Sequence, residues 1–164
     1  MQQIGSVIVL VALVVAGMFL VREEDRSALP ATPSFESISV PFTTLLQGDQ
    51  SKVAKRVNYL VTSDEGLKEL WSMLGTKSAM PKVDFNTRSV VAVFAGEQAT
   101  GGHSIAVAKI EDSASARTVS VALTAPGEGC MSAQVITAPF QVVELPSTEL
   151  EFTHKDTQVA VACE

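Results

Sequence analysis

A run of eighteen uncharged, mostly apolar residues near the start of the chain constrains the fold more than any other sequence feature. It extends from Ile4 to Val21. As a helix it would measure about 27 Å, close to the hydrocarbon core of a bilayer. We therefore predict a transmembrane anchor at residues 4–21, after a short tail at residues 1–3. The alternative is a cleaved signal peptide, which would carry basic residues before a shorter apolar stretch; Met1-Gln2-Gln3 has none.

The sequence around Gly17 bears on whether the chain carries a lipid anchor. Val15-Ala16-Gly17-Met18 is similar to a bacterial lipoprotein signal in which methionine replaces the acylated cysteine. A thioether cannot accept the lipid that a thiol accepts, so we expect no lipidation at Met18. The alternative is that small residues are simply common in membrane helices.

The rest of the chain is acidic and of ordinary composition. Every charged residue lies at Arg22 or later, and the net charge is −6. This balance argues against a nucleic-acid-binding protein, and the single apolar run argues against a polytopic membrane protein. Residues 22–36 are polar and contain two prolines, which predicts an extended tether. Residues 37–164 are then enough for one domain.

One amphipathic helix is predicted after residue 62. Thr62 and Glu65 have the spacing of a capping box, in which the hydroxyl and the carboxylate satisfy backbone donors of the first turn. Gly75 supplies the stop. Apolar residues recur at helical spacing between these signals, at Leu67, Leu70, Trp71 and Leu74.

The remainder of the domain is typical of β-structure. Alternating residues predict a strand over 53–61, and the continuous apolar run at 90–95 predicts a central strand that is covered on both faces. The predicted fold class is α+β, a predominantly antiparallel sheet or sandwich with one helix against it. Further strands are predicted at 104–110, 118–125, 134–137, 140–145, 149–153 and 158–163, with turns that include Lys155-Asp156.

The chain has two cysteines, Cys130 and Cys163. Two lone cysteines in an exported domain favour a disulfide, which would hold the C-terminal end against the irregular loop around Gly127–Cys130. Two reduced, buried thiols are the alternative. With His103 and His154 these cysteines match no zinc-binding spacing, so we expect no metal and no cofactor.

The sequence contains no recognisable catalytic motif. A cysteine nucleophile would need a histidine and an orienting group that the sequence does not identify, and a serine hydrolase elbow is absent. We expect the protein not to be an enzyme.

The loop Thr100-Gly101-Gly102-His103-Ser104 is the candidate binding site. Paired glycines allow close approach of the backbone to another surface, and the neighbouring side chains are polar. No lysine and no helix pattern follow, which excludes a phosphate-binding loop. The alternatives are a recognition loop carried on rigid strands and a hairpin connection that needs glycine for its geometry.

Two blocks of sequence resemble the C-terminal domain of the PrcB family of bacterial protease-complex subunits. The first contains Val83-Asp84-Phe85, the strand Val90–Phe94 with Ala95-Gly96-Glu97, and the segment Thr100–Ile105. The second contains Pro126-Gly127-Glu128-Gly129-Cys130, Gln134-Val135, Thr137-Ala138-Pro139-Phe140, Val142-Val143 and Leu145-Pro146. The resemblance covers residues 83–146.

The resemblance implies an exported, often lipid-anchored protein that associates with a partner protease and stabilises it. Two residues depart from the pattern: His103 stands where an aromatic residue is expected, and Met18 where a lipoprotein cysteine would stand. A membrane helix in place of the lipid anchor fits the second departure. The family also places the domain outside the cytoplasm, on a single-pass protein of the cell membrane.

We therefore expect a protein-binding module that contacts its partner through Thr100–Ser104, with Pro126–Gly129 as a second candidate contact. One alternative is a protease inhibitor similar to chagasin, which uses a Thr-Gly loop on a β-sandwich. Another is a structural envelope domain with no protease partner. A subunit would prolong the life of active protease, whereas an inhibitor would reduce its turnover.

Overall fold

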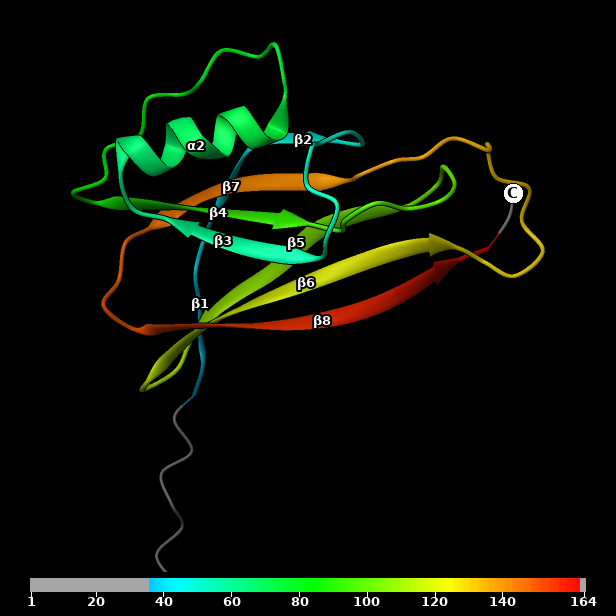
Figure 1. Ribbon diagram of the computed structural model, residues 1–164. Helices are drawn as coiled ribbons and strands as arrows, with labels where there is room; N and C mark the ends of the chain where they lie inside the picture. Colours follow the sequence, from blue (N-terminus) through cyan, green and yellow to red (C-terminus); the bar gives the residue numbers. More distant parts are fainter. Residues whose placement is uncertain (1–35, 163–164) are drawn as a thin grey trace, which may run out of the picture. The chain divides into compact units, whose positions relative to one another are not determined.

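Two four-stranded sheets and one helix make up the part of the chain that the computed structural model describes, residues 36–162 (Figure 1). Sheet A has the strand order β1-β5-β6-β8, and sheet B has the order β2-β7-β4-β3. The elements in chain order are β1 (Ile38–Ser39), β2 (Thr43–Gly48), β3 (Val57–Val61), α2 (Asp64–Leu74), β4 (Arg88–Phe94), β5 (Ser104–Asp112), β6 (Ala116–Pro126), β7 (Phe140–Pro146) and β8 (Glu151–Val161).

The predicted tail, the anchor at residues 4–21 and all but the last residue of the tether lie outside the described residues. Within residues 36–162, no helix is long and apolar enough to span a membrane. The anchor therefore stays a prediction.

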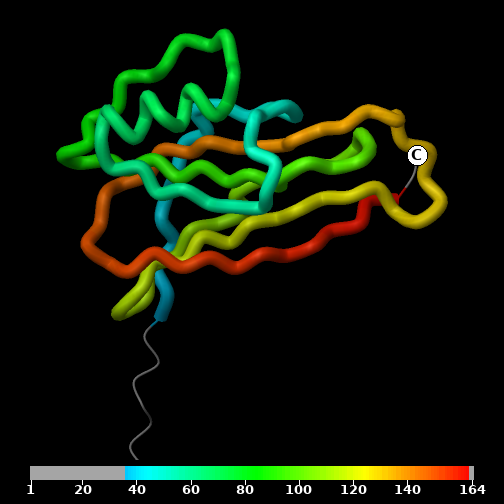
Figure 2. Tube along the Cα trace, in the orientation of Figure 1, coloured from blue at the N-terminus to red at the C-terminus, as the bar shows by residue number. Residues whose placement is uncertain are grey.

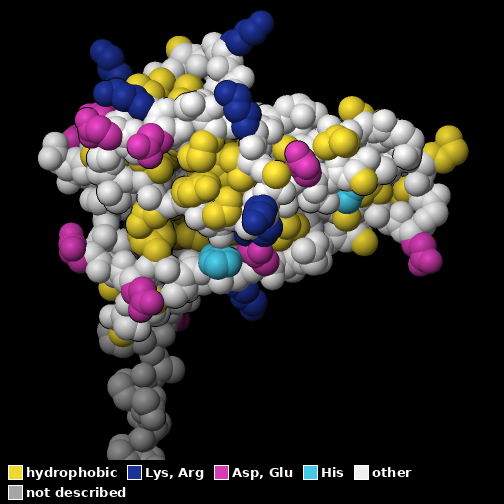
Figure 3. Space-filling view, in the orientation of Figure 1, with side chains coloured by type: hydrophobic (Ala, Val, Ile, Leu, Met, Phe, Trp, Pro, Cys, Tyr) yellow, Lys and Arg dark blue, Asp and Glu magenta, His cyan; other side chains and the backbone are white. Residues whose placement is uncertain are grey.

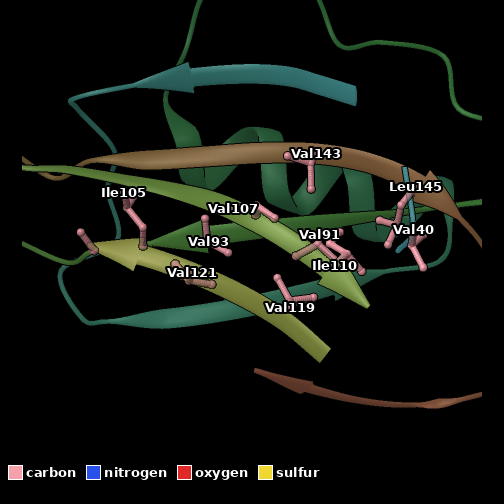
Figure 4. Packing of buried hydrophobic residues seen from close by; sticks show 11 residues of the cluster. Val40, Val91, Val93, Ile105, Val107, Ile110, Val119, Val121, Val143 and Leu145 are labelled. Carbon is pink, nitrogen blue, oxygen red and sulfur yellow. The ribbon is translucent and has the colours of Figure 1, made fainter. Parts of the chain in front are cut away.

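The predicted central strand is confirmed in β4, whose residues from Ser89 to Phe94 are all buried. Its even-numbered residues face α2 and its odd-numbered residues face sheet A, because side chains alternate along a strand. The layer between the sheets is built largely from valine, leucine and isoleucine side chains of both sheets (Figure 4). It contains Val40, Val91, Val93, Ile105, Val107, Ile110, Val119, Val121, Val143 and Leu145.

The predicted helix is confirmed as α2, but its cap differs from the prediction by one residue. The N-cap is Ser63, whose hydroxyl accepts a hydrogen bond from the backbone N–H of Gly66 at 3.2 Å. Gly75 ends the helix in the left-handed conformation, as predicted. Leu67, Leu70 and Leu74 are buried against sheet B, whereas Trp71 is only half-buried.

The C-terminal part of the domain differs from the prediction. Residues 149–153 and 158–163 were predicted as two strands with a turn at Lys155-Asp156, but β8 runs without interruption through this turn. No glycine or proline interrupts residues 151–161, and every one of them pairs with β6. This pairing is parallel, whereas all other strand pairs within residues 36–162 are antiparallel. β6 and β8 run in the same direction because β7, in sheet B, carries the chain back to the end of the sandwich at which β6 begins.

One side of the sandwich is closed by a segment that crosses between the sheets. Within residues 38–48, β1 pairs with β5, and β2 then pairs with β7. The buried side chain of Gln141 fills this side, where its Oε1 accepts a hydrogen bond from the Val107 N–H at 2.6 Å. Its Nε2 donates to the Thr44 hydroxyl at 3.2 Å. Neither β1 nor β2 was predicted, because their residues show no clear alternation.

The opposite side lies between two edge strands, β3 and β8. The predicted strand over 53–61 is shorter than expected, since β3 starts only at Val57. Arg56, just before it, forms a two-pronged ion pair with Asp156 of β8, with distances of 2.9 Å from Nε and 2.7 Å from Nη2. Beside this ion pair, hydrophobic side chains of β3 and β8, including Tyr59, Leu60 and Phe152, line a shallow groove (Figure 3).

Candidate functional site

The loop between β4 and β5 is held rigidly by a second loop. Gln98 and Thr137 exchange backbone hydrogen bonds of 2.8 and 3.0 Å, and the Gly101 N–H donates to the Ala133 carbonyl at 2.9 Å. The Thr137 hydroxyl adds a bond of 3.1 Å to the Thr100 carbonyl. The two loops therefore form one surface at one end of the sandwich, which we call the loop end (Figure 2).

The predicted site residues occupy different positions in this surface. Gly101 is buried, Gly102 is exposed, and Thr100, His103 and Ser104 are half-buried. The Thr100 hydroxyl lies 3.3 Å from Nε2 of His103, so these two side chains bond to each other. The loop thus presents less side-chain surface than the sequence indicates.

Gly102 is the residue at which glycine is required. Its φ is +83°, in the left-handed region, and a Cβ at this position would lie 2.9 Å from Cγ of Pro126. This close approach brings the end of β6 against the glycine loop. The two regions that were predicted as contacts, Thr100–Ser104 and Pro126–Gly129, therefore adjoin each other.

The segment at residues 134–137 was predicted as a strand, and this prediction is wrong. Only Thr137 pairs, in an isolated bridge with Gln98. Val135 and Ile136 are consecutive, and both are exposed, with 48% and 64% of their surface accessible. Met131 is fully exposed. The loop end therefore carries three exposed apolar side chains beside a rigid glycine loop.

These three side chains are candidate contact residues that the sequence analysis did not predict. The sequence carried no clear signal for Val135 and Ile136, because neighbouring apolar residues also occur in strands that are covered on both faces, such as β4. For Met131 we find no signal, because nothing in the sequence separates an exposed methionine from a buried one.

Two depressions flank the glycine loop. One, of about 270 Å³, has a mixed polar and apolar lining that includes Arg56, Gln98, His103, Asp156 and Gln158. The other, of about 490 Å³, is more open and is lined by Gly102, Pro126, Gly129, Cys130, Met131, Val161 and Ala162. Within residues 36–162, no group of three His, Cys, Asp or Glu side chains is arranged to hold a metal ion.

Cys130 lies beside the end of β8. Its Sγ is 3.9 Å from the Val161 carbonyl oxygen, and the Gly127 N–H donates to the same oxygen at 2.8 Å. No cysteine in the described part of the chain is free. Cys163 lies outside the described residues, so its pairing with Cys130 stays a prediction.

Comparison with known proteins identifies the central part of this fold. Residues 89–146 match the family model described as PrcB C-terminal. The chain contains a PrcB C-terminal domain. No curated protein and no solved structure matches the chain.

The PrcB C-terminal domain corresponds to the inner strands of both sheets. The match covers β4 from its second residue and then β5, β6 and β7, whereas β1, β2, β3, α2 and β8 fall outside it. In each sheet the matched strands are the two central ones. Both loops of the loop end also lie within the match, so this surface belongs to the domain that the family shares.

Proposed function

We propose that this chain is a membrane-anchored, extracytoplasmic binding module that associates with a protease and stabilises it. The supporting observation is the loop end, where the PrcB C-terminal domain presents Met131, Val135 and Ile136 beside a rigid loop. The backbone hydrogen bonds between the two loops fix the positions from which these side chains project, so little backbone entropy is lost on binding, which favours recognition of a protein. The proposal includes no catalytic step and no cofactor.

The binding surface can be tested with variants that leave the loops folded. Substitution of Gly102 would force a side chain against Pro126, so loss of binding there would not separate contact from misfolding. Met131→Ser and Ile136→Ser together remove two exposed apolar side chains instead. Ile38→Ser is a matched control, because Ile38 is 68% exposed on β1, outside the family match.

The experiment is affinity purification of the full-length chain from its native membranes, with detection of any protease that is retained. We expect a protease to co-purify with the native chain and the Ile38→Ser variant, and to be lost from the double variant. The lifetime of active protease should be shorter in cells without the chain. Purification without any protease would contradict the proposal and favour a structural envelope domain.

A protease inhibitor similar to chagasin is the second candidate, supported by the Thr100-Gly101 loop on a β-sandwich. This function predicts the opposite kinetic result. Stoichiometric addition of the chain would lower the turnover of the co-purified protease, whereas a stabilising subunit would maintain it.

A further inference from the structure

Four strands lie at the edges of the two sheets, and they differ in how they are protected from pairing with another chain. Native edge strands are commonly very short, bulged or interrupted by proline. β1 has two residues and β3 has five. β2 has a register shift between Thr44 and Leu46. β1 and β2 therefore carry a recognised form of protection, whereas β3 has an ordinary strand length.

β8 lacks these three forms of protection, and the charges Lys155 and Asp156 near its middle are the protection that it does carry. It has eleven residues, no proline, and no register shift along its pairing with β6. All of its residues except Phe152 are exposed, including Val159 and Val161 at 41% and 50%. Asp156, a charge on the face toward sheet B, is already paired with Arg56. The outer edge of β8 is therefore a long and regular template for a further strand.

The charge pattern of β8 selects a way in which two copies can pair. In an antiparallel pair related by a two-fold axis perpendicular to the sheet, the axis passes through one residue. An axis at Lys155 or Asp156 would place two like charges opposite each other. An axis at Thr157 places Lys155 opposite Val159 and Asp156 opposite Gln158. This register covers residues 153–161 of both strands and opposes no like charges. Axes at His154 or Gln158 also avoid like charges, but each pairs only seven residues of β8, so the axis at Thr157 gives the longest pairing.

We propose that two copies of this chain associate through antiparallel pairing of their β8 strands, with Thr157 on the two-fold axis. Sheet A of each copy then continues into sheet A of the other. Val159 and Val161 are covered by the alkyl part of Lys155 and by Thr153 of the second copy. The inference goes beyond the proposed function, because it rests on β8 rather than on the loop end.

Cysteine cross-linking of the full-length chain tests the register. Directly opposed residues in an antiparallel pair have Cα atoms about 4.5–5.5 Å apart, within the range that a disulfide spans. Thr157→Cys should therefore give a reducible dimer under a mild oxidant. Thr153→Cys is the matched control on the same face of the same strand. Its two copies would be about 27 Å apart, so we expect at least about tenfold less dimer.

Mixed samples extend the test to a second pair. Lys155→Cys and Val159→Cys chains should cross-link when they are combined, and neither should do so efficiently alone. No dimer from Thr157→Cys, or equal amounts from Thr157→Cys and Thr153→Cys, would overturn the proposal. A cross-link from Thr157→Cys to a different protein instead of a second copy would overturn it as well.

A charge substitution tests the association without cysteines. Val159→Lys places lysine opposite Lys155 twice in each dimer, and we expect the concentration for half-dimerisation to rise about tenfold. Lys155→Glu added to Val159→Lys should restore association, because opposite charges then face each other. The measurement is light scattering of the detergent-solubilised full-length chain. A monomer at all concentrations, or equal association of all three chains, would overturn the proposal.

Discussion

Arg117 is a buried charged residue that joins both sheets. Only 3% of its surface is accessible, and it donates to Asp112 at 2.6 Å from Nε and 2.7 Å from Nη2. It also donates to the Pro146 carbonyl at the end of β7, and its guanidinium lies 5.8 Å from the ring centre of Phe152. One side chain therefore connects the β5–β6 hairpin to β7 and β8.

Asp112 should make the stability of the domain sensitive to acid. Its hydrogen bonds with Arg117 hold the pKa of this carboxyl below the ordinary value of 3.8. A pKa that is lower in the folded state contributes stability above the unfolded value, and this stability is lost as the pH falls through the folded value. We therefore expect the free energy of unfolding to decrease below pH 3.8.

Asp112→Asn tests this contribution. We expect the variant to lose roughly 2–3 kcal/mol at neutral pH, somewhat less than for a fully buried pair because Asp112 keeps some contact with water. Its unfolding free energy should also depend less on pH in the acid range, in urea titrations of the full-length chain. Asp49→Asn, at an exposed carboxylate, is the control. Parallel pH curves for Asp112→Asn and the native chain would contradict the prediction.

Gly96 and Gly129 form a matched pair for a second prediction. Their φ values are +79° and +82°, so alanine meets nearly the same backbone strain at both. A Cβ at Gly96 would lie 2.9 Å from backbone atoms of residues 54–56, whereas nothing lies within 4 Å at Gly129. We expect Gly129→Ala to cost ~1–2 kcal/mol and Gly96→Ala distinctly more. Equal losses of unfolding free energy in chemical denaturation would contradict this prediction and show that the backbone of residues 54–56 moves away from the added Cβ at little cost.

At the scale of the elements, β4 and α2 were predictable because their signals are local. The run at 90–95 and the spacing of Leu67, Leu70 and Leu74 depend on no distant residue. β8 was not predictable in the same way, because the polar pair Lys155-Asp156 is typical of a turn. Its strand conformation comes from pairing with β6, which the sequence does not reveal.

The candidate site was predictable in its position more than in its chemistry. The paired glycines indicated a backbone conformation that other residues rarely adopt, and the structure confirms it in the positive φ of Gly102. The exposed side chains of Val135 and Ile136 depend on the hydrogen bonds between the two loops, such as Gly101 to Ala133. Such contacts between distant segments leave no local pattern.

The cap of α2 gives a prediction at this scale. Ser63→Ala removes the hydroxyl that accepts from the Gly66 N–H, and we expect a loss of ~1 kcal/mol. Thr62→Ala, one residue earlier, should change the stability by much less. Thermal unfolding of both variants distinguishes the two cap positions, and a larger loss for Thr62→Ala would favour the capping box expected from the sequence.

At the scale of the whole molecule, the predicted disulfide would fix the C-terminal end of the sequence. Cys130 already lies against Val161, the last residue of β8, and Cys163 follows Val161 by two residues in the sequence. Closing a loop of this length contributes roughly 3–4 kcal/mol in the chain-entropy model. We expect the full-length chain, purified from its native membranes and denatured without reductant, to contain no free thiol.

Cys130→Ser provides the energetic half of this test. The variant should lose about 3 kcal/mol of stability, and a reducing agent should then have no further effect on it. The native chain should lose a similar amount when it is reduced. Two free thiols in the unreduced native chain would contradict the disulfide.

The strand order of sheet B also governs when this domain can fold. β7 lies between β2 and β4, and Thr43 pairs with Glu144. Until β7 has been synthesised, β2 has no neighbour in its sheet, and the inner layer lacks Val143 and Leu145. Folding must therefore wait for residues near the C-terminal end and proceeds through contacts of high sequence separation, which are slow to form. A chain interrupted before residue 140 has no route to the native state.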